Sequence, residues 1–305
     1  MNVLPVLIIA AILHASWNAF VKDQNNGLVT VTIISSSMAC IALPLTLVVG
    51  LPSSEIWIYL GVSTLAHTLY MHSMTRAYAL YDFSIGYPFA RGLAPLLTTL
   101  ILIFFFNAQV SLIELLGILL IVGAIFLLLP KAITKIKASD LISMSYFPLA
   151  IAFYTIVDAE GIQHATNPYQ YMVWIFILAS VPMLIYNLTF NRSHLITTLS
   201  SQKLKFFVTA LVSITSYTLV LWAYTKAPTH YVASVRESSI IFASLIGLYF
   251  FKESGIIKRL EYGNVIVDLN RTESIIRKEE LIPRDVLKTG DRIKAYCYDV
   301  IRENK

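Results

Sequence analysis

The stretch Leu112-Ile-Glu-Leu-Leu-Gly-Ile-Leu-Leu-Ile-Val-Gly-Ala-Ile-Phe-Leu-Leu-Leu-Pro130 contains a single charged residue, Glu114, among its 19 positions. A helix of roughly 20 apolar residues is long enough to cross the hydrocarbon core of a bilayer. Lipid offers no hydrogen bonds, so a crossing chain must satisfy its backbone within helices or a closed barrel. The stretch therefore predicts a membrane-spanning α-helix.

Eight other segments share this apolar character, and short polar connections separate them. Together with the first, they lie at residues 3–21, 28–49, 57–75, 83–105, 112–130, 142–160, 170–190, 206–225 and 230–251. Connections as short as Asn25-Asn26-Gly27 are typical of helices that pack beside one another. We therefore expect an all-α polytopic membrane protein with about nine transmembrane helices.

Composition supports this fold class for most of the chain and sets its last part aside. The 305 residues are 57% hydrophobic and 13% charged, and the mean hydropathy is +0.69. Soluble domains carry about 25% charged residues. Residues 252–305 nevertheless hold 22 of the 41 charged residues. The chain thus consists of two unlike segments joined near Lys252.

Several function classes find no support in the sequence. The two cysteines, Cys40 and Cys297, lie in different segments, so no disulfide framework is indicated. There is no HExxH motif, no phosphate-binding Gly-rich loop and no recognisable nucleophile–base pair. The net charge of +5 is modest, so charge alone does not mark a polyanion binder. We expect no enzyme activity, no metal site and no cofactor.

Loop charges predict the orientation of the chain, because cytoplasmic loops are enriched in Lys and Arg. Apart from Lys226, the basic residues of the loops fall on one side of the bundle. They are Lys22, Arg76, Lys131, Lys135, Lys137, Arg192, Lys203 and Lys205. This places the N-terminus outside and the charged tail in the cytoplasm. The first span lacks a preceding basic region, so we interpret it as a spanning helix rather than a cleaved signal peptide.

Two arginines lie well inside predicted spans and are candidate functional residues. Arg91 is about eight residues into its span and Arg236 about six into its own. A charge at membrane depth costs a few kcal/mol on insertion scales and usually faces the bundle interior. Either arginine could hold an anionic substrate group or gate access to it. Alternatively, each pairs with a carboxylate or with carbonyl groups and locks the bundle.

Polar and aromatic side chains add further candidates for a solute site. His14, Trp17 and Asn18 share one helical face, and His67 and Tyr70 form a similar pair in the third span. The alternative for the first group is an interhelical hydrogen bond, with Asn18 turned away from lipid.

The later spans contain polar residues of less certain role. Tyr217 and Trp222 in the eighth span could line a cavity, or could serve packing alone. Asp158 and Glu160 close the sixth predicted span, and we expect them at the water interface.

The two halves of the apolar part repeat weakly. The pair Ala77-Tyr78 precedes Arg91, as Ala223-Tyr224 precedes Arg236, and each half then reaches a Phe-Phe pair. A repeat of five helices is odd in number, so its second copy would insert upside down. Inverted repeats are typical of secondary transporters, with the solute site near the midplane between them. The predicted repeats are residues 1–130 and 131–253.

The motifs also resemble those of a known family. They are His14-Ala-Ser-Trp-Asn-Ala19, Arg76-Ala-Tyr78, Tyr87-Pro-Phe-Ala-Arg-Gly-Leu-Ala-Pro95, Ala152-Phe-Tyr-Thr-Ile-Val-Asp158, Leu221-Trp-Ala-Tyr224 and Arg236-Glu-Ser-Ser-Ile-Ile-Phe242. Over residues 1–253 the chain resembles the EamA family of the drug/metabolite transporter superfamily. The resemblance implies ten helices in two inverted five-helix repeats, so the tenth helix would be missing here. It also implies transport of small metabolites such as amino acids, and it places Tyr87 among the motif residues.

The charged tail, residues 254–305, resembles a different protein. The segments 255–269, 279–284 and 290–300 are similar in order to the RNA-binding OB-fold domain of the transcription factor NusA. Alternating side chains predict about four strands, one fewer than an OB-fold barrel. The resemblance implies RNA binding, whereas the incomplete barrel argues against it.

Three functions follow as alternatives. The first is a secondary transporter of the bacterial inner membrane that moves small metabolites by alternating access, coupled to a proton or solute gradient. The second is an impaired fusion of a transporter fragment with a NusA fragment. The third is a membrane-tethered RNA-binding protein.

Overall fold

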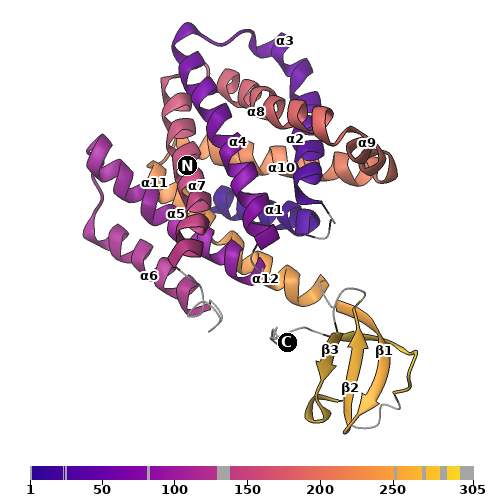
Figure 1. The fold of residues 1–305 in the computed structure, drawn as a ribbon. Helices are drawn as coiled ribbons and strands as arrows, with labels where there is room; N and C mark the ends of the chain where they lie inside the picture. Colours follow the sequence, from indigo (N-terminus) through magenta and orange to yellow (C-terminus); the bar gives the residue numbers. More distant parts are fainter. Residues whose placement is uncertain are drawn as a thin grey trace. The chain divides into compact units, whose positions relative to one another are not determined.

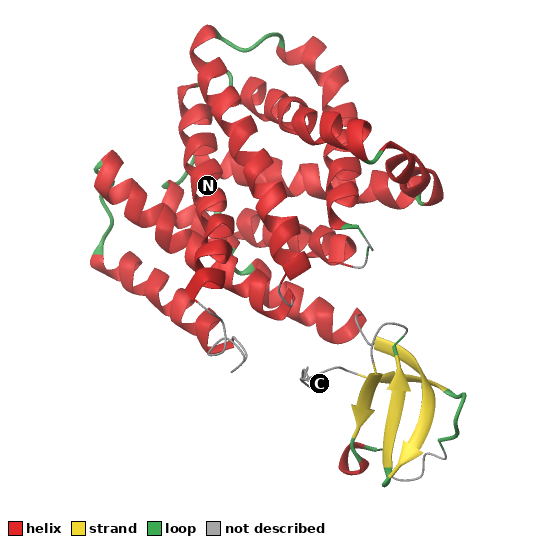
Figure 2. Cartoon of the chain, viewed as in Figure 1, coloured by secondary structure: helices red, strands yellow, loops and turns green. Residues whose placement is uncertain are grey.

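The computed structural model describes residues 2–22, 24, 26–80, 83–128, 138–250, 253–269, 273–281 and 287–295. The chain divides into two compact units, Met1–Ala243 and Ser244–Lys305. The first unit is helical and the second contains the strands (Figures 1 and 2). Loop positions 131, 135 and 137, which entered the orientation prediction, lie outside the described residues.

Twelve α-helices follow one another along the described chain. They are α1 Leu4–Lys22, α2 Gly27–Ala42, α3 Thr46–Val49, α4 Trp57–Leu80, α5 Phe83–Phe106, α6 Leu112–Leu128, α7 Ala138–His164, α8 Pro168–Phe190, α9 Arg192–Ser201, α10 Lys203–Tyr224, α11 Thr229–Arg236 and α12 Ser239–Phe250. Short 3-10 turns at Leu43–Leu45 and Ser54–Ile56 precede α3 and α4.

Local sequence explains where several helices begin. The Asn26 side chain caps α2 by accepting a hydrogen bond from Val29 N, and Asn167 caps α8 through Tyr169 N. Ser111 and Glu114 form a capping box before α6, each side chain accepting from the other residue's backbone N–H. Glu114, the one charged residue of the apolar stretch 112–130, thus caps the N-terminus of α6.

Five helical segments in the described part are long and apolar enough to cross a membrane. They are Leu4–Val21, Gly27–Val49, Phe89–Phe106, Pro168–Phe190 and Lys203–Tyr224. Several apolar side chains are exposed outside the bundle, including Leu47 (90%) and Ile113 (83%). These features are compatible with a multi-pass membrane protein.

The described part of the chain is mostly helical, but the predicted spans do not all correspond to single helices. The segment 230–251 is not one continuous helix, because a turn at Glu237–Ser238 separates α11 from α12. The helices α4 and α7 fall outside the five apolar segments, and each carries polar residues within its length, among them His67 and Asp158.

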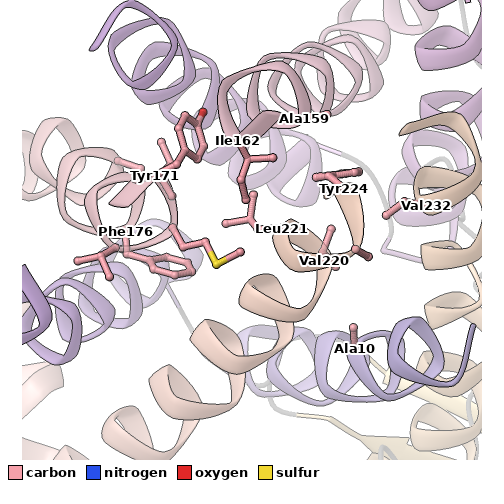
Figure 3. Close-up of a cluster of buried hydrophobic side chains, with 14 of the residues drawn as sticks. Ala10, Ala159, Ile162, Tyr171, Phe176, Val220, Leu221, Tyr224 and Val232 are labelled. Atoms are coloured by element: carbon pink, nitrogen blue, oxygen red, sulfur yellow. The ribbon is translucent and has the colours of Figure 1, made fainter. Parts of the chain in front are cut away.

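Helices from the first half of the chain pack on helices from the second half. The most extensive pairs are α4 with α7, α1 with α10, α2 with α8, and α5 with α7. One buried cluster joins side chains of α7, α8 and α10, among them Ile162, Tyr171 and Leu221 (Figure 3). A second contains Val29, Phe147 and other residues of α1, α2, α4, α5, α7, α9 and α10.

The second unit contains an antiparallel four-stranded sheet of order β3-β2-β1-β4. The strands are β1 Glu253–Glu261, β2 Asn264–Asp268, β3 Glu273–Ile276 and β4 Arg292–Ala295. The β1–β2 turn is Tyr262-Gly263. Both turn residues have positive φ, 52° and 85°, as a two-residue hairpin turn requires. Ile257, Val265 and Val267 form the hydrophobic core of the second unit. The predicted last strand extends into 296–300, which lies outside the described residues.

Candidate functional site

A cavity of about 100 Å³ lies inside the helical unit. Its walls come from α1, α2, α4, α7, α8 and α10, so both halves of the chain contribute. The lining residues are His14, Trp17, Val31, Ile34, Ser35, Met38, His67, Tyr70, Met71, Met74, Tyr154, Ile175, Phe176, Ala179, Ser180, Ser213 and Tyr217. The lining is mostly aromatic, aliphatic or thioether in character.

One buried carboxylate, Asp158 of α7, organises the wall of this cavity. Its Oδ1 accepts hydrogen bonds from the hydroxyls of Ser63 and Tyr171, the latter at 2.8 Å. Its Oδ2 accepts from His67 Nε2 at 2.9 Å and from the Tyr217 hydroxyl. The Asp158 side chain has no exposed surface. A single carboxylate thereby connects α4, α7, α8 and α10.

Helical spacing explains how these donors reach the carboxylate. Ser63 and His67 are four residues apart, so both project from the same face of α4 toward α7. Gly161 lies nearly one turn beyond Asp158, and a Cβ there would be 2.3 Å from the Tyr171 ring and 2.8 Å from Tyr59 Cβ. Glycine is therefore required at 161 for Tyr171 to approach Asp158.

Aromatic contacts hold His67 in place at the cavity. Its ring stacks on Tyr154 with the centroids 4.5 Å apart and meets the edge of Tyr217 at 5.6 Å. Tyr70 packs against Tyr154 at 5.2 Å. The His67 side chain is 12% exposed. Of the four side chains that bond Asp158, His67 and Tyr217 line the cavity. The predicted pair of His67 and Tyr70 does line one site.

Arg91 of α5 is paired with a carboxylate. Its guanidinium lies 3.1 Å from Oε1 of Glu237 in the α11–α12 turn, and both side chains are at most 3% exposed. Arg91 also donates to Nε2 of His14 in α1. Of the two interpretations of Arg91, the described contacts match the pairing that locks helices together. Asn18 Nδ2 donates to the carbonyl of His14 within α1, and His14 makes the interhelical contact of this group, with Arg91.

Arg236 likewise lies behind the cavity wall. Its guanidinium donates to the Tyr154 hydroxyl at 2.9 Å and lies 5.7 Å from the centre of the Tyr154 ring. Such a cation–π contact is worth more when it is removed from water. Tyr154 therefore separates Arg236 from the cavity, and His14 occupies the equivalent place between Arg91 and the cavity.

The candidates thus divide into cavity-lining and supporting residues. His14, Trp17, His67, Tyr70 and Tyr217 line the cavity, whereas Arg91 and Arg236 do not. Trp222 packs against the first hydrophobic cluster instead. The side chain of Tyr87 lies outside the described residues.

Sequence reasoning placed Asp158 wrongly at the water interface. The expected end of the span at residue 160 set that position, but α7 continues to His164. Asp158 is therefore more than a turn inside the helix, where burial demands partners. The signal that could have identified it is the set of polar side chains, Ser63 and His67, on one face of the third span.

The comparison with curated proteins finds a short segment shared with one bacterial protein. No family model matches the chain. The transcription termination/antitermination protein NusA of Rickettsia conorii is 56% identical over 52 residues, or 17% of this chain. NusA of Rickettsia prowazekii gives the same values. The chain therefore carries a segment similar to NusA. That NusA-like segment spans about a tenth of the length of either relative.

Proposed function

We propose that residues 1–253 form a secondary transporter of the EamA type, which moves small metabolites such as amino acids or related solutes across the bacterial inner membrane. In alternating access, a solute site near the middle of the membrane faces one side and then the other. The observation that carries the proposal is the cavity itself. Helices α1, α2 and α4 of the first predicted repeat and α7, α8 and α10 of the second enclose it.

The Asp158 network supports coupling to a proton gradient. As an anion, this carboxylate accepts hydrogen bonds from four side chains on three other helices, α4, α8 and α10. A protonated carboxyl group carries an O–H donor and loses acceptor capacity, so it cannot keep all four. Protonation would thus loosen α4, α8 and α10 from α7. Arrival of a proton through His67 is consistent with its exposure to the cavity.

The interrupted ninth segment also supports the proposal. Transporter sites are often built where a membrane helix is broken. Here the break between α11 and α12 places Glu237 in contact with Arg91 of α5. A turn linked by an ion pair to another helix offers two half-helices that can move relative to one another.

Solute exchange by the reconstituted full chain tests this function. We expect vesicles containing the chain to exchange at least one labelled solute from a panel of amino acids and small amides. Ser213→Leu should reduce that exchange at least about tenfold by filling the cavity. Thr215→Leu changes an exposed position of the same helix, so it should leave exchange unchanged.

The NusA-like segment favours a second candidate. A chain that shifts labelled RNA in a salt-sensitive manner, yet exchanges no solute, would be a membrane-tethered RNA-binding protein. Absence of both activities in a folded, inserted chain would contradict the transporter proposal and favour an impaired fusion.

A further inference from the structure

We infer that the cavity binds an uncharged solute of about one ring in size, and that neither Arg91 nor Arg236 contacts it. The inference rests on the proposed function only for the statement that this solute crosses the membrane. It narrows the solute class from small metabolites in general to neutral ones with a flat apolar group, such as small amides, and sets aside the amino acids, which carry charged groups.

Every Asp, Glu, Lys or Arg side chain near the cavity lies outside its lining. Asp158 is surrounded by four donors, Arg91 is paired with Glu237, and Arg236 is covered by Tyr154. Moving a charged group out of water costs much more than the bonds of neutral groups repay, unless a partner compensates it. A charged solute would find no uncommitted ionic partner among the described lining residues.

The two histidines in the lining do not change this balance. An imidazolium has no lone pair, so the contact that Arg91 makes with Nε2 of His14 requires a neutral ring. Any charge on His67 is matched by the carboxylate of Asp158 in contact with it. The lining is therefore close to neutral as a whole.

The shape and surface of the cavity favour a flat apolar group. Trp17, Tyr70, Tyr154, Phe176 and Tyr217 contribute ring surfaces, and rings pack on one another at offset or edge-on angles. An apolar cavity of about 150 Å³ accommodates benzene. The present cavity measures about 100 Å³.

Side chains that can adapt make up the difference in size. Met38, Met71 and Met74 lie in the lining, and thioether side chains adjust readily to a ligand. A single ring is therefore close to the largest group that the cavity admits once these side chains adjust.

A hydroxyl group in the lining remains available to a solute. The hydroxyls of Ser35 and Ser180 donate to carbonyl groups of their own helices. The hydroxyls of Tyr217 and Tyr154 are engaged with Asp158 and Arg236. The Ser213 hydroxyl, in contrast, makes no hydrogen bond in the described part of the chain. It is placed to bond a neutral amide, hydroxyl or carbonyl group of the solute.

Equilibrium binding of labelled benzamide to the full chain in lipid nanodiscs tests the inference. Benzamide, benzoate and benzamidinium have nearly the same shape but are neutral, anionic and cationic. We expect saturable benzamide binding, and displacement by benzoate or benzamidinium only at concentrations at least about tenfold higher than unlabelled benzamide requires. Ser213→Ala should weaken benzamide binding about three- to tenfold through the lost hydrogen bond.

Substitutions that fill the cavity provide a second, independent test of benzamide binding. Ser213→Leu and Ala179→Leu, on α10 and α8, should each abolish saturable binding. Their controls are Thr215→Leu and Val181→Leu, at exposed positions of the same two helices. Two helices are used so that one poorly folded variant does not decide the result.

Two results would overturn the inference. One is displacement of labelled benzamide by benzoate at concentrations equal to or below those that unlabelled benzamide requires. This result would indicate that an arginine contacts the bound solute. The other is the absence of saturable binding to a folded chain. Benzamide binding without any solute exchange would leave the inference intact and remove the transporter function. Exchange of charged solutes without benzamide binding would support the transporter function and overturn the inference.

Discussion

Asp158→Ala should lower the free energy of unfolding of the helical unit by about 3–5 kcal/mol, the usual cost of removing one partner of a buried ion pair. The substitution leaves His67, Tyr171 and Tyr217 without the acceptor that they share. It also opens a space where four helices meet. Thermal unfolding of the purified full chain in detergent, followed by circular dichroism, measures the loss.

Two variants separate the role of the charge from general damage to α7. Asp158→Asn keeps the size and one carbonyl acceptor, so we expect a smaller loss than for alanine. Glu160→Ala, two residues along the same helix, removes a carboxylate that is only partly buried. It should change stability by less than about 0.5 kcal/mol. Equal effects of Asp158→Ala and Glu160→Ala would contradict the network described around Asp158.

Gly161→Ala should destabilise the same region by about 1–3 kcal/mol, as overpacking of a filled core does. The added Cβ would meet Tyr171 Cε2 at 2.3 Å and Tyr59 Cβ at 2.8 Å. Tyr171 is fully buried and cannot turn outward, so its ring must shift away from Asp158. We expect a lower unfolding temperature together with weakened benzamide binding, because the cavity wall moves with the ring.

Gly61→Ala is the matched control for this substitution. Gly61 also lies inside a helix, α4, but a Cβ there meets nothing within 4 Å. Alanine favours helix over glycine by up to about 1 kcal/mol, so Gly61→Ala should leave stability unchanged or raise it. A stable Gly161→Ala protein with an unchanged unfolding temperature would show that Tyr171 does not pack as described.

Most helical segments of this protein could be predicted from sequence, because a long apolar run is compatible with lipid only as a helix whose backbone is hydrogen-bonded internally. Helix α6 covers Leu112–Leu128 of the apolar stretch, and its one charged residue, Glu114, caps the start of the helix. The turn at Glu237–Ser238 could not be predicted in the same way. Apart from Arg236, its neighbours on both sides are apolar or small, and Glu237 pairs with Arg91 of α5.

The candidate site could be predicted only in part, because its contacts join distant parts of the chain. His67 and Asp158 are 91 positions apart, and Arg91 and Glu237 are 146 apart. Periodicity within one helix placed His67 and Tyr70 on one face, and both line the cavity. Periodicity carried no information on which helix would face them, so it did not indicate that Asp158 is buried beside His67 or that Arg91 pairs with Glu237 outside the cavity lining.

Sided labelling at position 213 tests most directly whether the cavity is the site of alternating access. The experiment places Ser213→Cys in a chain whose Cys40 and Cys297 are serine, and applies a membrane-impermeant maleimide to sealed vesicles of either orientation. We expect reaction from each side of the membrane, slowed by benzamide, and none from either side for the control Thr215→Cys, at an exposed position of the same helix. Reaction from one side only, or from neither, would contradict it.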